Sequence, residues 1–222
     1  MPVMPNVDFL NRQGTVRFRP PEPAGCILHR TENPRFAQTA QSFRASPHYP
    51  HFLVGKGGEL LQIVDTDFQA VHVANANAHF LGIELSSIPS RWSNRQDPLT
   101  TSDPLTPAQT ESLRRIVDWV STTHNIPKFG PPSSKEMKNA HGFWNGFCSH
   151  ADVSMAIPNA SQHEEGLEDQ EFIGLAIFPS ASRQAESGMT ELQRKLHRGL
   201  MTPAVKKKDQ ELSNFLNRLG RH

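Results

Sequence analysis

Two histidines stand where strand-like apolar runs end, and they are the residues best suited to binding a metal. The run at residues 25–31, Gly-Cys-Ile-Leu-His-Arg-Thr, carries His29, and the short run Phe-Cys-Ser-His at 147–150 ends in His150. Zinc binds about three protein ligands from His, Cys, Asp or Glu and keeps one position for water or substrate. A lone histidine at a strand end is more often a hydrogen-bonded structural residue, so the metal hypothesis depends on further ligands.

Further oxygen and nitrogen ligands follow the second histidine. The stretch after it contains four candidate ligands: Asp152, His163, Glu164 and Glu165. A separate carboxylate, Glu84, interrupts the apolar run at residues 80–85, where a charge is costly unless it is paired or linked to a metal. Histidines are common and this spacing is loose, so the pattern alone is compatible with a zinc site and with structural histidines.

The elements that would position these residues include several short strands. Besides the two runs that carry the histidines, strand-like runs occur at residues 51–55, 59–64 and 80–85. Lys-Gly-Gly at 56–58 is typical of a hairpin turn, so the first two of these runs should form a β-hairpin.

Two helices are expected among these strands. Residues 35–43 place Phe, Ala and Phe on one helical face. A second helix begins at Thr106, the expected N-cap, because proline follows at the first helical position and Gln109 completes a capping box. This helix should end before Pro127. The segments expected to be irregular are 1–24, 88–105 and 128–147.

Composition argues against several classes of protein. The chain has 222 residues and a formal net charge of +1, which removes the electrostatic argument for nucleic acid or an anionic membrane as partner. Two cysteines are too few for a disulfide scaffold. No apolar run approaches the roughly 20 residues needed to cross a bilayer. The N-terminal residues do not resemble a secretory signal peptide, so synthesis in the cytoplasm is expected.

The pattern of apolar residues changes after about residue 167. A short apolar run at 172–178 is followed by leucine stripes at helical spacing and by three lysines at 206–208. The lysines are typical of a solvated helix face, and an anionic partner is the alternative. The predicted division is into residues 1–170, with a core at about 24–167, and a helical C-terminal extension at 171–222.

The order of five motifs adds specificity to the candidate site. They are Leu28-His29-Arg30-Thr31, His51-Phe52-Leu53-Val54 with Gly57-Gly58, residues 70–77 (Ala-Val-His-Val-Ala-Asn-Ala-Asn), Leu81-Gly82-Ile83-Glu84, and Ser149-His150-Ala151-Asp152-Val153. In this order they resemble the zinc N-acetylmuramoyl-L-alanine amidases, a family that includes peptidoglycan recognition proteins and phage lysozyme-amidases. The resemblance implies an α/β fold, with a central mixed β-sheet flanked by helices. It also implies cleavage of the amide between N-acetylmuramic acid and L-alanine in peptidoglycan.

The resemblance also implies roles for individual residues around a zinc ion (Zn2+). His29 and His150 match the two zinc histidines, and Glu84 matches the glutamate proposed as general base. The chain departs from the family at the third ligand, usually the aspartate of Asp-Pro-Gly. Here Glu165 would replace that aspartate, and His163 would match the histidine that stabilises the oxyanion. The alternatives are that His163 is itself the ligand, or that there is no third ligand.

Other residues near these motifs have both structural and functional interpretations. His72 would line the substrate groove or hold a loop, and His51 is more often structural. Asp152 is expected to hold the backbone after the second zinc histidine. Cys26 and Cys148 are expected to be buried thiols, with a disulfide or a thiolate ligand as alternatives.

Three functions remain open at this stage. The first is a zinc amidase acting on peptidoglycan or muropeptides, without nucleic acid or a membrane span. The second is a muropeptide-binding module of the same fold that does not cleave, and the third is an unrelated α/β domain with structural histidines. As an enzyme, the chain would act on the cell wall after release or export, as a phage lysin or toxin, or would recycle wall fragments.

Overall fold

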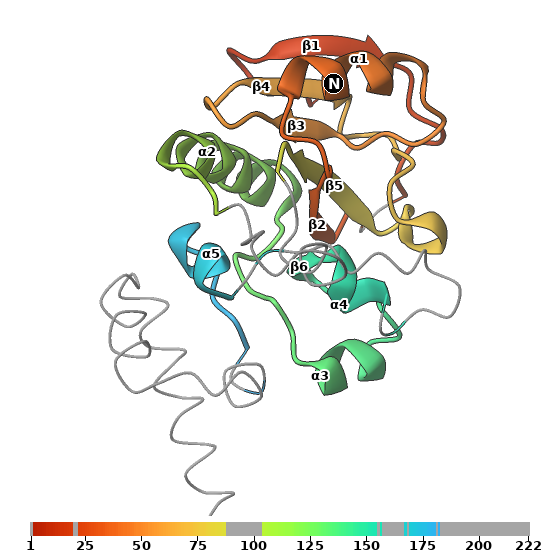
Figure 1. Cartoon of the computed structure of the whole chain (residues 1–222). Coiled ribbons are helices and arrows are strands. Elements are labelled where there is room, and N and C mark those ends of the chain that lie inside the picture. Colours follow the sequence, from red (N-terminus) through yellow and green to blue (C-terminus); the bar gives the residue numbers. More distant parts are fainter. Residues whose placement is uncertain are drawn as a thin grey trace, which may run out of the picture.

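A six-stranded mixed β-sheet is the framework of the chain (Figure 1). The computed structural model describes residues 2–19, 22–87, 104–154, 156, 167, 169–180 and 182. The strands are β1 (Asp8–Arg12), β2 (Gly25–Arg30), β3 (Phe52–Val54), β4 (Leu60–Val64), β5 (Phe80–Leu85) and β6 (Gly146–Ser149), in the order β1-β4-β3-β5-β2-β6. The prediction of a central mixed sheet flanked by helices is therefore confirmed.

Strand pairing brings together segments that are far apart in the sequence. Strand β2 lies between β5 and β6 and runs parallel to both. Strands β3 and β4 are antiparallel and form the expected hairpin. Strand β1 was missed, because residues 1–24 were expected to be irregular. Its short sequence, Asp-Phe-Leu-Asn-Arg, shows little apolar alternation, and its pairing comes from the distant β4.

Helices cover both faces of this sheet. They are α1 (Phe36–Ala45), α2 (Pro107–His124), α3 (Ser134–Asn139), α4 (His150–Ser154) and α5 (Asp169–Gly174), with a 3₁₀ turn η1 at Ala74–Ala76. Helix α2 begins with the predicted Thr106 capping box. Helix α3 lies in a segment expected to be a loop, and His150 begins α4 instead of ending a strand, which corrects two predictions.

The two faces of the sheet are packed differently. On the face that we call the α2 face, Cys26 and Leu28 of β2 join one core with the apolar stripe of α2. The opposite face, which we call the site face, carries two separate cores. One contains Ile27 with residues of η1, α3 and α4, and the other contains Leu53 with partly buried residues of α1. Figure 1 shows α1 and α4 far apart along the sheet.

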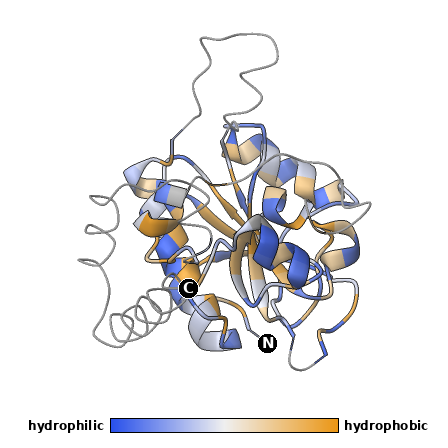
Figure 2. Cartoon of the chain, turned by 90° about the horizontal axis from the view of Figure 1, so that it is seen from below, coloured by the Kyte–Doolittle hydropathy of each residue, from blue (hydrophilic) through white to orange (hydrophobic). Residues whose placement is uncertain are grey.

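The helices show the amphipathic character that this layering requires. Hydrophobic and hydrophilic residues alternate along them in Figure 2, whereas the central strands are mainly hydrophobic. In the part of the chain that the structure describes, no helix has both the length and the apolar character needed to cross a membrane.

Residues 171–180, which were predicted to belong to the C-terminal extension, pack against the α2 face. Phe172, Leu175 and Ile177 are buried in its core. The guanidinium of Arg30 on β2 is 2.6 Å from the carboxylate of Glu171 in α5. This part of the chain is therefore continuous with the sheet domain. The predicted helices at 192–219 lie outside the described residues, so the division into two domains stays a prediction.

Candidate active site

Strands β2 and β5 place a histidine and a carboxylate side by side on the site face. His29 and Glu84 are register partners at the carboxyl ends of these parallel strands. Side chains alternate between the faces of a strand, so both point away from the α2 face, which takes their neighbours Leu28 and Ile83. His29 is almost completely buried, and Glu84 is partly exposed.

The second histidine is fixed by the junction between β6 and α4. The backbone N–H and the hydroxyl of Ser149 both donate to one Asp152 carboxylate oxygen, each at 2.8 Å. The Asp152 N–H donates back to the Ser149 hydroxyl at 3.3 Å. Asp152 thus holds the backbone around His150, as expected, and the short strand ends where the histidine begins the helix.

Three imidazole rings meet on the site face. The Nδ1 atoms of His29 and His150 are 3.2 Å apart, and the Nε2 atom of His29 is 3.0 Å from Nδ1 of His72. Burial is the main reason why the pKa of His72 falls to about 3, helped by the nearby His51, so its ring is neutral at neutral pH. The sequence placed His72 in the groove but did not reveal its contact with His29.

His51 is committed to the backbone. Its Nε2–H donates to the Phe68 carbonyl oxygen at 2.9 Å, and its Nδ1 accepts from the Gly82 N–H at 2.9 Å. Burial is the main cause that lowers its pKa to about 4. Both ring nitrogens are hydrogen-bonded to the backbone, so His51 links β5 to the loop that follows β4.

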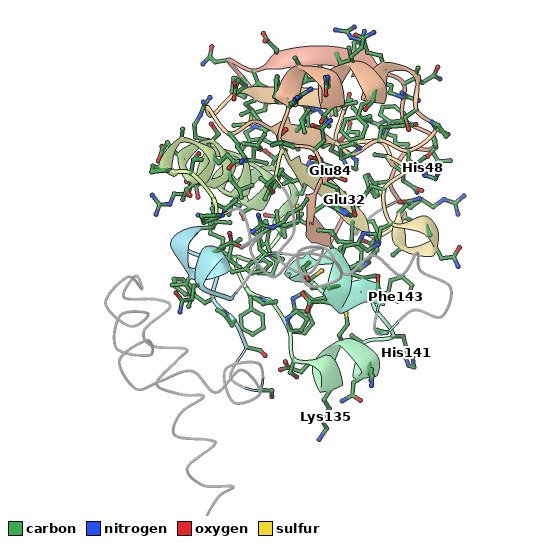
Figure 3. All side chains as sticks on the ribbon, viewed as in Figure 1. Glu32, His48, Glu84, Lys135, His141 and Phe143 are labelled. Carbon is green, nitrogen blue, oxygen red and sulfur yellow. The ribbon has the colours of Figure 1, made fainter. Side chains whose placement is uncertain are left out.

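A cavity of about 310 Å³ opens beside these rings. It is lined by His29, Phe43, His48, Tyr49, Pro50, Val71, His72, Ala74, Glu84 and His150. Figure 3 labels Glu84 and His48, which come from different walls. The part of the cavity wall formed by residues 48–50, which follow α1, was not predicted. These residues show no periodicity, and they reach the site only because α1 places them there.

The described residues fit part of a zinc site. Two nitrogens bound to one tetrahedral zinc ion lie about 3.3 Å apart, because each Zn–N bond is about 2.0–2.1 Å long. The measured 3.2 Å between the Nδ1 atoms of His29 and His150 matches this separation. No group of three or more potential ligands is found among the described residues. The candidates for the third ligand, His163 and Glu165, lie outside them.

The two cysteines do not form a disulfide. Cys26 and Cys148 are both free and buried, and they belong to cores on opposite faces of the sheet. Burial raises the pKa of both thiols well above the ordinary value, so thiolate ligands are disfavoured. The expectation of buried thiols is confirmed, and the disulfide alternative is wrong.

Several solved structures are similar to this chain. The N-acetylmuramyl-L-alanine amidase AmiD from E. coli, solved with the substrate anhydro-N-acetylmuramic acid-L-Ala-D-gamma-Glu-L-Lys, is 17% identical with a TM-score of 0.51, over 81% of this chain and 68% of that chain. LysC from Clostridium intestinale URNW is also 17% identical, with a TM-score of 0.46, over 84% and 99% of the two chains. PGRP-SA from Apis mellifera is 9% identical, with a TM-score of 0.39, over 53% and 76%. No curated protein matches the chain.

The sequence itself matches a family profile over most of the described fold. The profile is that of N-acetylmuramoyl-L-alanine amidase, and it covers residues 19–160. This range includes five of the six strands and both histidines whose Nδ1 atoms face each other. The chain therefore belongs to the N-acetylmuramoyl-L-alanine amidase family.

Proposed function

We propose that this protein hydrolyses the amide bond between the lactyl group of N-acetylmuramic acid and L-alanine of the peptidoglycan stem peptide, with zinc as its cofactor. Family membership supports the reaction. The observation that carries the zinc proposal is the 3.2 Å separation of the His29 and His150 Nδ1 atoms. Both rings line a cavity that also contains Glu84.

Each residue of the site would have a separate task. His29 and His150 would hold zinc together with Glu165. When bound, zinc acts as a Lewis acid toward the scissile carbonyl and the attacking water. The Glu84 carboxylate would accept a proton from that water and donate it to the amine of the departing L-alanine. His163 would donate a hydrogen bond to the oxyanion that forms at the carbonyl.

The cavity is large enough to enclose only part of the substrate. Its volume of about 310 Å³ is at the lower end of the range for small-molecule sites, so it would enclose the lactyl and L-alanine groups around the scissile bond. The rest of the glycan and the stem peptide would extend outside. The muropeptide in the AmiD structure is a ligand of this kind, and we propose the same substrate class for this chain.

The third ligand can be identified with three neighbouring variants. We expect Glu165→Ala to release zinc, whereas His163→Ala should keep zinc and lose on the order of 10²–10³-fold in turnover, as for loss of an oxyanion donor. Glu164→Ala is the matched control and should keep both zinc and activity. Zinc loss in His163→Ala with retention in Glu165→Ala would instead make the ligands His29, His150 and His163.

The reaction is tested by mass spectrometry of purified muropeptides incubated with the full-length protein. We expect a peptide with a free L-alanine amine and the corresponding N-acetylmuramic acid product. A chelator should abolish both products, and added zinc should restore them. Binding of the muropeptide without cleavage, in zinc-loaded protein, would show a recognition module instead of a hydrolase.

A further inference from the structure

His72 connects His29 to the backbone, and both of its ring nitrogens are engaged. Its Nε2 atom is 3.1 Å from the carbonyl oxygen of Phe80, and its Nδ1 atom is 3.0 Å from Nε2 of His29. A carbonyl oxygen can only accept a hydrogen bond. The Nε2 atom of His72 therefore carries a hydrogen.

The position of this hydrogen determines the tautomer of the next ring. A neutral imidazole carries one ring hydrogen, so with that hydrogen on Nε2 the Nδ1 atom of His72 has a lone pair and accepts. The hydrogen bond between the two rings must then be donated by Nε2–H of His29. A neutral His29 that carries its hydrogen on Nε2 has its lone pair on Nδ1, the atom that lies 3.2 Å from Nδ1 of His150.

We infer that His72 is a positioning residue that holds His29 in the Nε2–H tautomer, so that its Nδ1 atom can serve as a metal ligand. The inference rests on the proposed zinc site but not on the substrate. The opposite tautomer would put a hydrogen on Nδ1 and block it as a ligand. Histidines that bind metals ordinarily donate their second N–H to a carboxylate, a carbonyl or water; here another histidine accepts it and relays the contact to a carbonyl.

The residues around His72 leave space for its ring and fix its position. A Cβ atom on Gly82 would lie 2.6 Å from Cγ and Nδ1 of His72, so only glycine on β5 leaves space for it. The side-chain oxygen of Asn77 accepts hydrogen bonds from the backbone N–H groups of His72 and Val73, at 2.9 and 2.8 Å. The strand below and the loop beside the ring therefore both define its position.

The first test measures the tautomer directly in the full-length protein without metal. Histidine labelled with ¹⁵N is observed at neutral pH by two-bond ¹H–¹⁵N correlation, and the His29 signals are identified by their loss in His29→Gln. We expect the Nε2–H pattern for His29. The Nδ1–H pattern for His29 in wild-type protein would overturn the inference, whatever the substrate is.

The second test measures zinc affinity by competition with a chelator. His72→Phe keeps a ring but removes the acceptor, and we expect roughly 10- to 100-fold weaker zinc binding, the usual effect of losing such a partner. His72→Asn places an acceptor near the former Nδ1 atom and should recover most of the affinity. His48→Phe is the control from the same cavity and should bind zinc as wild type does.

The outcomes separate this inference from the proposed function. Wild-type zinc affinity in His72→Phe, or equal losses in His72→Phe and His72→Asn, would overturn the role of His72. Neither measurement depends on cleavage of a muropeptide. A protein that binds zinc and shows the expected tautomer but cleaves nothing would contradict only the proposed function.

Discussion

The same strands form both faces of the sheet, but the two faces have different roles. On the α2 face, Leu28 and Ile83 belong to one continuous apolar core with α2 and residues up to Ile177. On the site face, their neighbours His29 and Glu84 lie side by side between two separate cores. The α2 face is stabilised by burial, whereas the site face leaves an opening between the helices that cover it.

Short strands can hold a site in place because their two faces have different neighbours. Alternation along β2 and β5 gives each strand one face that packs in the core of the α2 face, and a second face on which His29 and Glu84 line the cavity. The polar side chains of the site face are held by hydrogen bonds to each other and to backbone groups, such as that of His72 to Phe80. Mutations on the α2 face should therefore affect stability, whereas mutations of the polar residues that line the cavity on the site face should affect metal or turnover.

The largest effect is expected from Glu84 on the site face. Glu84→Gln removes the group that accepts and returns the proton but keeps its shape, so turnover of muropeptide should fall by roughly 10²- to 10⁴-fold. Zinc content and the urea midpoint should stay near the wild-type values. Turnover close to wild type would exclude Glu84 from the mechanism and would break the assignment of chemistry to this face.

The adjacent residue provides the matched test of the α2 face. Ile83 is fully buried, and Ile83→Ala should lower the free energy of unfolding by roughly 2–5 kcal/mol, because it leaves a cavity in the core. Ile83→Val should cost only about 0.5–1.5 kcal/mol. Urea unfolding gives both values. If the folded Ile83→Ala protein loses zinc, the two faces are not independent.

The contact between α5 and β2 tests how far the core extends along the chain. Arg30 is 2% exposed and Glu171 15% exposed in their side chains, so Glu171→Ala would leave a buried guanidinium without this carboxylate. We expect a loss of about 3 kcal/mol in unfolding free energy. Gln170→Ala, on the exposed side of the same helix, should change stability little. Equal stability of the two variants would contradict a core that includes α5.

The buried His51 should make stability depend on pH. Its pKa is about 4 in the folded protein and about 6.5 in an unfolded chain. Between these values the unfolded state binds more protons, so stability is complete above pH 6.5 and falls as the pH drops toward 4. Between pH 7 and pH 5, in chelator, wild type should lose about 2 kcal/mol more than His51→Gln. Parallel losses in the two proteins would mean that His51 is protonated in the folded state.

Much of the sheet could be predicted because its strands are apolar and bounded by turn residues. The run at residues 25–31 and the run around Glu84 show this, and both became adjacent parallel strands. Helix α3 could also have been found, because Ser133 and Glu136 form a capping box that the sequence contains. The Gly, Pro and Ser residues around it obscured that signal.

The other features of the fold and the site depend on contacts between distant segments, which leave no periodic pattern in the sequence. Strand β1 forms because β4 is there to pair with it. The contact of His72 with His29 requires both the space above Gly82 and the loop held by Asn77. The roles of His163 and Glu165 stay predictions, because these residues lie outside the part of the chain that the structure describes.

The most direct test of the zinc site is the metal content of purified protein. Wild type, His29→Ala and the exposed control His48→Ala are purified in parallel, loaded with zinc, and analysed for zinc after removal of loosely bound metal. We predict stoichiometric zinc in wild type and His48→Ala, and none in His29→Ala. Equal zinc in all three proteins, or none in wild type, would contradict a zinc site built on His29 and His150.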